Sequence, residues 1–170
     1  GAFFYFLFGT YYKEVAQQGV CLARMRYEDR TSPVGKVHKR HNGDWQEPGL
    51  NGKVTPLLPV RKDWYAPEPD TFWGPSVHWN EHIEKYVILM NRAVGPNWKQ
   101  EGVYLCITDD IGDPNSWSEP LKILPGEVGW YPQVVGDANR QGTDRAARHE
   151  SRLFIHGRSN YRIRFSLEND

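Results

Sequence analysis

The chain has 170 residues, and its 21 Lys and Arg are balanced by 21 Asp and Glu, so the formal net charge is zero. This balance gives no electrostatic reason to expect a nucleic acid or a membrane as a partner, and no apolar run is long enough to span a bilayer. Frequent Gly and Pro, without long apolar stretches at helical spacing, predict an all-β protein with many turns.

The first predicted strand covers residues 2–9, Ala-Phe-Phe-Tyr-Phe-Leu-Phe-Gly. It lacks the basic start and the cleavage site of a signal peptide, so we expect a buried core strand. Because Gly1 stands directly before this strand and no initiator Met precedes it, we expect the chain to be the C-terminal part of a longer protein.

A long segment from about residue 26 to residue 70 is predicted to be a loop, since it is rich in Gly, Pro, Lys and His. It holds one short apolar piece at residues 54–60. That piece is expected to form either the outer strand of a sheet or a strap across a face.

A repeated sequence frame is the strongest signal in the chain. Residues 72–79 and 129–136 share the order Trp-x-Pro-x-Val, and the two frames begin 57 residues apart, at Trp73 and Trp130. The alternative is chance similarity between strand-rich segments. A unit repeating at this scale, with its motifs in the same order, is typical of stacked or radial architectures.

An apolar strand is predicted after each frame, at residues 85–91 and 152–158. Residues 2–9 are an earlier counterpart, and aligning Gly9 with Asn91 gives an offset of 82. We therefore predict a partial β-propeller of about three blades, the first without its innermost strand. Such an open ring leaves strand edges exposed. The predicted units cover roughly residues 1–70, 71–127 and 128–170.

Two further features belong to these units. The spacing after the second frame predicts about ten extra residues between the first two strands of the last unit, in a charged surface loop at 137–150. Cys21 and Cys106 fall at different places of comparable strands. They are expected to be two buried thiols, because nothing in the repeat brings them within disulfide distance.

The segment 108–124 identifies the kind of blade more closely. In it a turn at Asp113-Pro114-Asn115 is followed by Trp117-Ser118-Glu119-Pro120 and a predicted outer strand. Together with the opening Gly-Pro-Ser-Val-His-Trp before Lys-Tyr-Val-Ile-Leu, it resembles the blades of the five-bladed β-propeller glycoside hydrolases. That superfamily includes arabinanases, β-xylosidases, arabinofuranosidases and, more distantly, invertase-like enzymes. The resemblance implies a five-bladed ring, an oligosaccharide or polysaccharide partner, no cofactor, and a secreted or periplasmic location.

Glycoside hydrolysis needs two carboxyl groups across the scissile bond. In arabinanase-like enzymes these groups open two of the blades, but here Trp73 and Ser76 stand at the matching positions. The acids of a hydrolase would then lie elsewhere. Our catalytic candidates are Glu68 and Asp70, two residues apart in a Pro-rich turn that leads into the predicted axial strand; the alternative is a solvated turn.

Five residues are candidates for binding a sugar. Ser76 and His78 alternate on one strand and should face the same side. Arg92 ends the next strand and could bind a hydroxyl or a carboxylate, or form a structural ion pair. Trp64 and Trp73 offer flat rings on which the apolar face of a sugar can stack, although most aromatic residues in such a fold serve packing.

The sequence therefore predicts a glycoside-hydrolase-like propeller that cleaves or binds glycans in an axial pocket. The alternatives are a non-catalytic carbohydrate-binding propeller and a protein-interaction propeller. No Cys-x-x-Cys or His-Glu-x-x-His pattern is present, so no metal site is predicted.

Overall fold

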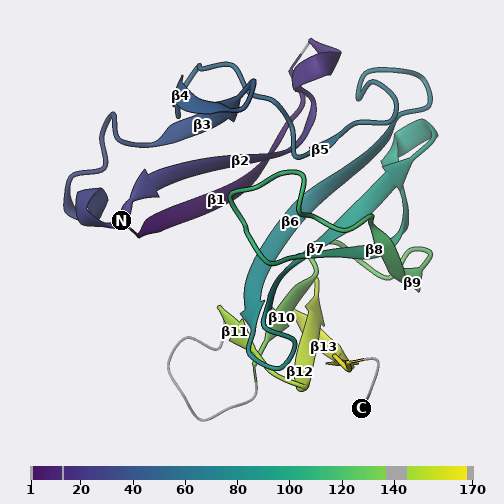
Figure 1. Cartoon of the computed structure of the whole chain (residues 1–170). Coiled ribbons are helices and arrows are strands. Elements are labelled where there is room, and N and C mark those ends of the chain that lie inside the picture. Colours follow the sequence, from purple (N-terminus) through teal and green to yellow (C-terminus); the bar gives the residue numbers. More distant parts are fainter. Residues whose placement is uncertain (1, 13, 137–144, 168–170) are drawn as a thin grey trace.

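The computed structural model describes residues 2–12, 14–136 and 145–167 (Figure 1). Within these ranges the protein is all-β, as predicted, and its helical pieces are short 3₁₀ turns at Val15–Gln17, Tyr27–Thr31 and Pro96–Trp98. The described part contains no helix with the length and apolar character needed to cross a membrane. The strands form three sheets, and each draws its main strands from one of the three predicted units.

The first sheet has β2 (Gly19–Arg26) near its centre, with β1 (Phe3–Thr10) on one side. On the other side β2 pairs with β3 (His38–His41) and, at its start, with β5 (Leu58–Pro59). β3 continues into β4 (Asp44–Pro48), so the segment expected to be a loop contains a hairpin. The reason is local: Asn42 and Gly43 adopt φ of 50° and 88°, which suits the two-residue turn of a hairpin.

The second sheet is an antiparallel meander with strongly curved long strands (Figure 1). Its strands are β6 (Asp70–Asn80), β7 (Lys85–Val94), β8 (Lys99–Thr108) and β9 (Leu121–Pro125). The predicted turn is present before β9, where Asp113 accepts hydrogen bonds from the backbone N–H groups of Asn115 and Ser116. The outer strand predicted after it is confirmed as β9.

The third sheet consists of β10 (Gln133–Val135), β12 (Glu150–Ile155) and β13 (Arg158–Arg164). The predicted insertion falls between β10 and β12. Residues 137–144 of it lie outside the described residues, and the part that follows forms β11 (Ala146–Ala147). β11 pairs with the end of β6 in parallel orientation, so it ties the third unit to the second sheet.

The predicted repeat is visible in the strand register. Gly9 of β1 stands opposite Val20, and Asn91 of β7 stands opposite Val103, so the sequence offset is kept in the pairing. The two Trp-x-Pro frames also share a backbone feature: the residue before proline has a positive φ, 62° at Gly74 and 59° at Tyr131. β1 and β2 are therefore the structural counterparts of β7 and β8.

The core lies on both faces of the second sheet. Ile88 and Met90 of β7 pack toward the first sheet, whereas Val87 and Leu89 pack toward the third sheet. Successive side chains of a strand point to opposite faces, which explains this alternation. Both cysteines are buried and free, as predicted.

Candidate functional site

An aromatic cluster forms near the starts of β6 and β10. Its rings come from segments far apart in the sequence, which the three sheets bring together. The members of the aromatic cluster are Tyr11, Trp64, Trp73, Trp98, Trp130 and Tyr131.

Trp64 and Trp73 are the central members of the aromatic cluster. The Trp64 ring stacks on Trp98 with centroids 5.3 Å apart, and it lies 4.1 Å from the Tyr11 ring. Trp73 lies 6.0 Å from Trp64 and packs edge-on against Trp130 at 5.0 Å. The tryptophans of the two repeated frames are therefore in contact.

Two buried amide side chains hold the loop before β10 against the second sheet. The Gln100 side chain accepts a hydrogen bond from the Gly129 N–H at 2.8 Å and donates one to the Gly129 carbonyl at 2.5 Å. Asn91 accepts a hydrogen bond from the Tyr131 N–H at 2.9 Å and donates to the same Gly129 carbonyl at 3.2 Å. Because these amides satisfy backbone groups that the sheets leave unpaired, they fix the position of Trp130.

Two members of the aromatic cluster, and one residue next to it, have a positive φ. Among the described residues, seven non-glycine residues have a positive φ, and Asn97, Trp98 and Tyr131 are three of them. This conformation is unfavourable for residues with a Cβ atom, and it is found preferentially at functional sites. A hydrogen bond from the Trp98 Nε1 to the Trp64 carbonyl, at 3.2 Å, helps to hold Trp98 in place.

An open groove of about 550 Å³ runs beside the aromatic cluster. Trp98 and Trp130 line it, and Lys99, Gln100 and Glu127 place polar groups along it. Trp98 is 40% exposed, so part of its ring is open to a ligand. Lys99 and Glu127 form an exposed ion pair at 3.0 Å. The groove thus combines flat apolar surfaces with hydrogen-bonding groups, as sugar-binding sites do.

The predicted catalytic residue Asp70 is bound to the predicted binding residue Arg92. The Arg92 Nε and Nη2 atoms donate to the two Asp70 carboxylate oxygens at 2.8 and 2.7 Å, and the side chains are only 20% and 15% exposed. These hydrogen bonds hold the pKa of Asp70 below its usual value. Arg92 is therefore engaged in the structural ion pair that was the alternative to a sugar contact.

Glu101 completes this network from β8. It is the extra residue of a β-bulge, because Gly102 and Gln100 are the register partners of Arg92 and Ala93. Burial raises the pKa of Glu101, but hydrogen bonds from Lys122 and Tyr104 outweigh it and lower the pKa overall. Asp70 and Glu101 are thus both held as carboxylates.

Glu68 lies apart from this network. Its side chain is 68% exposed and lies 3.8 Å from Lys62, so Glu68 and Asp70 are paired with different cations. The assignment of the two carboxyl groups to catalysis stays a prediction. The ion pair with Arg92 favours a structural role for Asp70, since a carboxylate that is hydrogen-bonded to a guanidinium is a poor proton donor.

Ser76 and His78 point to the same side of β6, as expected, but that side faces the third sheet. The Ser76 hydroxyl donates to the Pro132 carbonyl at 2.7 Å. His78 is 3% exposed and packs edge-on against Phe165, and burial lowers its pKa to about 4. The His78 Nε2 has no hydrogen-bond partner within the described part of the chain. Both residues thus lie in an interface between sheets.

The structure adds residues to the site that the sequence did not single out. The sequence predicts stacking at Trp64 and Trp73, and both belong to the aromatic cluster, although other rings pack against Trp64. Trp98 and Trp130, which line the groove, are not among the residues that the sequence analysis assigns to the site. The repeated frame could have indicated Trp130, and the Gly-Pro-Asn-Trp order before β8 could have indicated Trp98.

No group of three or more His, Cys, Asp or Glu side chains in the described ranges is arranged to hold a metal ion. Comparison with known proteins gave no relative: no model of a protein family matches the chain, and neither a curated protein nor a solved structure matches it.

Proposed function

We propose that the chain is part of a β-propeller that binds carbohydrate in the groove beside the aromatic cluster. The observation that carries the proposal is that Trp98 and Trp130 line a groove together with four polar side chains, those of Asn97, Lys99, Gln100 and Glu127. Three successive sheets, the strand register that the first two share, and two repeated frames in contact through Trp73 and Trp130 support the propeller architecture. A five-bladed ring of the glycoside hydrolase type is the parent architecture that we propose.

The chemistry of the groove supports a sugar ligand over an extended apolar one. A pyranose or furanose ring presents apolar C–H groups on its faces and hydroxyl groups around its rim. The exposed part of Trp98 can contact a face, while Lys99 and Glu127 can donate to and accept from hydroxyl groups. The two hydrogen bonds between the Gln100 side chain and the Gly129 backbone hold that side of the groove rigid, which lowers the entropic cost of binding.

Binding without cleavage is the form of the proposal that the carboxylates favour. Glycoside hydrolysis requires a carboxyl group that is protonated near neutral pH, which needs a raised pKa. Asp70 and Glu101 both have lowered pKa values. Hydrolysis through Asp70 and Glu68 remains the alternative, and the experiment below separates the two.

The test is a glycan array, followed by calorimetric titration of the best ligand into the wild-type chain and into Trp98→Ala. Loss of a stacking ring is expected to weaken binding by about tenfold. Tyr161→Ala is the matched control, since Tyr161 is 38% exposed on β13, in the third sheet, and does not line the groove. Reducing-sugar release from the bound glycan is measured in the same samples.

Each outcome decides one point. Binding that is weakened by Trp98→Ala and unchanged by Tyr161→Ala, with no sugar released, supports a carbohydrate-binding protein. Sugar release that is abolished by Asp70→Asn would select the hydrolase. If the wild-type chain binds no glycan at millimolar concentration, the carbohydrate proposal is wrong.

A further inference from the structure

A second site of interest lies along the free edge of β1, away from the aromatic cluster. β1 pairs with β2 on one side, and no described strand pairs with its other side. The strand carries no charge and no proline, and Phe6 is 42% exposed. Natural proteins normally protect such an edge, because unpaired backbone groups beside apolar side chains readily accept another strand.

The hydrogen-bond pattern shows which backbone groups are free. The Tyr27 N–H donates to the Ala2 carbonyl at 3.0 Å, and these two residues lie one step beyond Phe3 and Arg26, the first pair of the register. Hydrogen-bonded pairs alternate along an antiparallel ladder, so the even-numbered residues of β1 bond to β2. The N–H and C=O groups of Tyr5, Leu7 and Gly9 therefore point to the open edge.

The repeat identifies the kind of strand that fits this edge. β1 is the counterpart of β7, and β7 pairs along the corresponding edge with β6, which carries the Trp-x-Pro-x-Val frame. In that ladder Trp73 stands opposite Asn91, the counterpart of Gly9. A strand of the same pattern beside β1 would place its tryptophan opposite Gly9 and its valine opposite Phe6.

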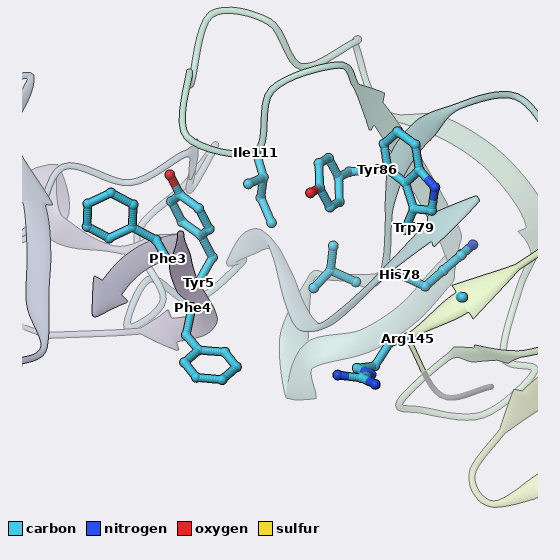
Figure 2. A pocket seen from close by; sticks show the side chains of 10 residues that line it. Phe3, Phe4, Tyr5, His78, Trp79, Tyr86, Ile111 and Arg145 are labelled. Atoms are coloured by element: carbon cyan, nitrogen blue, oxygen red, sulfur yellow. The ribbon is translucent and has the colours of Figure 1, made fainter. Parts of the chain in front are cut away.

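A cleft is present where such a strand would run. It has a volume of about 560 Å³ and lies between the start of β1 and the end of β6. Figure 2 shows Phe3 and Tyr5 on one side of the cleft and Tyr86 and Trp79 on the other, with Ile111 between Tyr5 and Tyr86 in this view. The residues of an added strand that pair with Phe3–Tyr5 would enter this aromatic cleft.

We propose that the free edge of β1, with this cleft, binds an extended polypeptide segment of the Trp-x-Pro-x-Val pattern by antiparallel strand addition. Backbone hydrogen bonds from Tyr5, Leu7 and Gly9 provide the pairing. The apolar, uncharged character of β1 selects an uncharged segment, since a charge placed against Phe6 would lose its water without gaining a partner. The two frames within this chain are already paired, β6 with β7 and β10 with β12, so the segment comes from outside the described residues.

The probe is a fluorescently labelled peptide with the sequence of residues 71–80, which holds the frame and no Asp, Glu, Lys or Arg, titrated into the full chain. A scrambled peptide of the same composition is the control. We expect saturable binding of the first peptide and binding at least about tenfold weaker for the second. The exchange rates of individual backbone amides are then measured by NMR. We expect the amides of Tyr5, Leu7 and Gly9 to gain protection, whereas those of Phe4 and Phe6, already bonded to β2, change little.

Two variants at one position separate pairing from side-chain contact. Tyr5→Ala and Tyr5→Pro both remove the ring, but only proline also removes an N–H that points to the open edge, where proline is tolerated in a strand. We expect Tyr5→Pro to bind the peptide about five- to tenfold more weakly than Tyr5→Ala, because proline removes the one edge hydrogen bond that the Tyr5 N–H would donate.

Three results would overturn the proposal. The first is no binding of the frame peptide to the wild-type chain. The second is protection of even- and odd-numbered β1 amides alike. The third is dimerisation of the chain without peptide, measured by light scattering, that protects the amides of Tyr5, Leu7 and Gly9. In that case a second copy, and not a frame segment, occupies the edge.

Discussion

The ion pair between Asp70 and Arg92 offers a direct test of how the second sheet is stabilised. In Asp70→Asn the guanidinium loses the charged partner of two hydrogen bonds and retains the Tyr104 hydroxyl at 3.4 Å and Glu101 at 4.0 Å. An exposed ion pair contributes about 0–1 kcal/mol, and breaking a buried one costs about 3–5 kcal/mol. With side chains 15% and 20% exposed, this pair lies between the two, and we expect a loss of about 2 kcal/mol.

The measurement is urea unfolding at pH 7, followed by tryptophan fluorescence, for the wild type, Asp70→Asn, Arg92→Met and the double variant. The double variant corrects for the cost of leaving one charge without its partner. We expect an interaction free energy of at least about 1 kcal/mol between Asp70 and Arg92 from this cycle.

The pH dependence gives a second check on the same pair. The pKa of Asp70 in the folded protein is lower than its ordinary value of about 3.9, so the pair contributes fully above that pH. As the pH falls further, the unfolded chain binds a proton before the folded one does, and the contribution is lost. The stabilities of wild type and Asp70→Asn should therefore converge below about pH 4. A difference under about 0.5 kcal/mol at pH 7, or one that persists in acid, would refute the role assigned to this pair.

Two further predictions concern the interface with the third sheet. Gln100→Ala should lower the free energy of unfolding, measured in urea, by about 1–3 kcal/mol, because both backbone groups of Gly129 lose a partner. It should also weaken glycan binding, because Trp130 is displaced. Unchanged stability and affinity would argue against the role of the two Gln100–Gly129 hydrogen bonds. His78 has a folded pKa of about 4 against 6.5 unfolded, so the wild type should lose about 3 kcal/mol as the pH falls from 6.5 to 4, while His78→Phe should not. Parallel stability curves for the two proteins over this range would contradict burial of a neutral His78.

The sequence predicted those parts of the fold that depend on repetition. The offset between Gly9 and Asn91 reappears in the strand register, and the two frame tryptophans, Trp73 and Trp130, touch. These predictions succeeded because equivalent strands use equivalent side chains at equivalent places. The Asn42-Gly43 turn could also have been predicted, since this dipeptide is a strong hairpin signal, but the surrounding Pro, Lys and His residues favoured the prediction of a loop.

The partners of individual site residues depended on details that a single sequence does not carry. The bulge at Glu101 shifts the register by one residue, and that shift places its carboxylate near Arg92. Trp98 joins the aromatic cluster through a left-handed backbone in a short loop. The Trp64 ring, predicted to stack on a sugar, packs against Tyr11 and Trp98, because segments from different units bring these rings to one place.

The middle position of β7 has a consequence for how the molecule tolerates change. Ile88 and Met90 on one face, and Val87 and Leu89 on the other, are completely shielded from water. A larger side chain at any of these places shifts the backbone that the opposite face also uses, and a smaller one leaves a cavity beside it. Substitutions on the two faces of β7 should therefore be coupled, so that a change on one face is best tolerated together with a compensating change on the other.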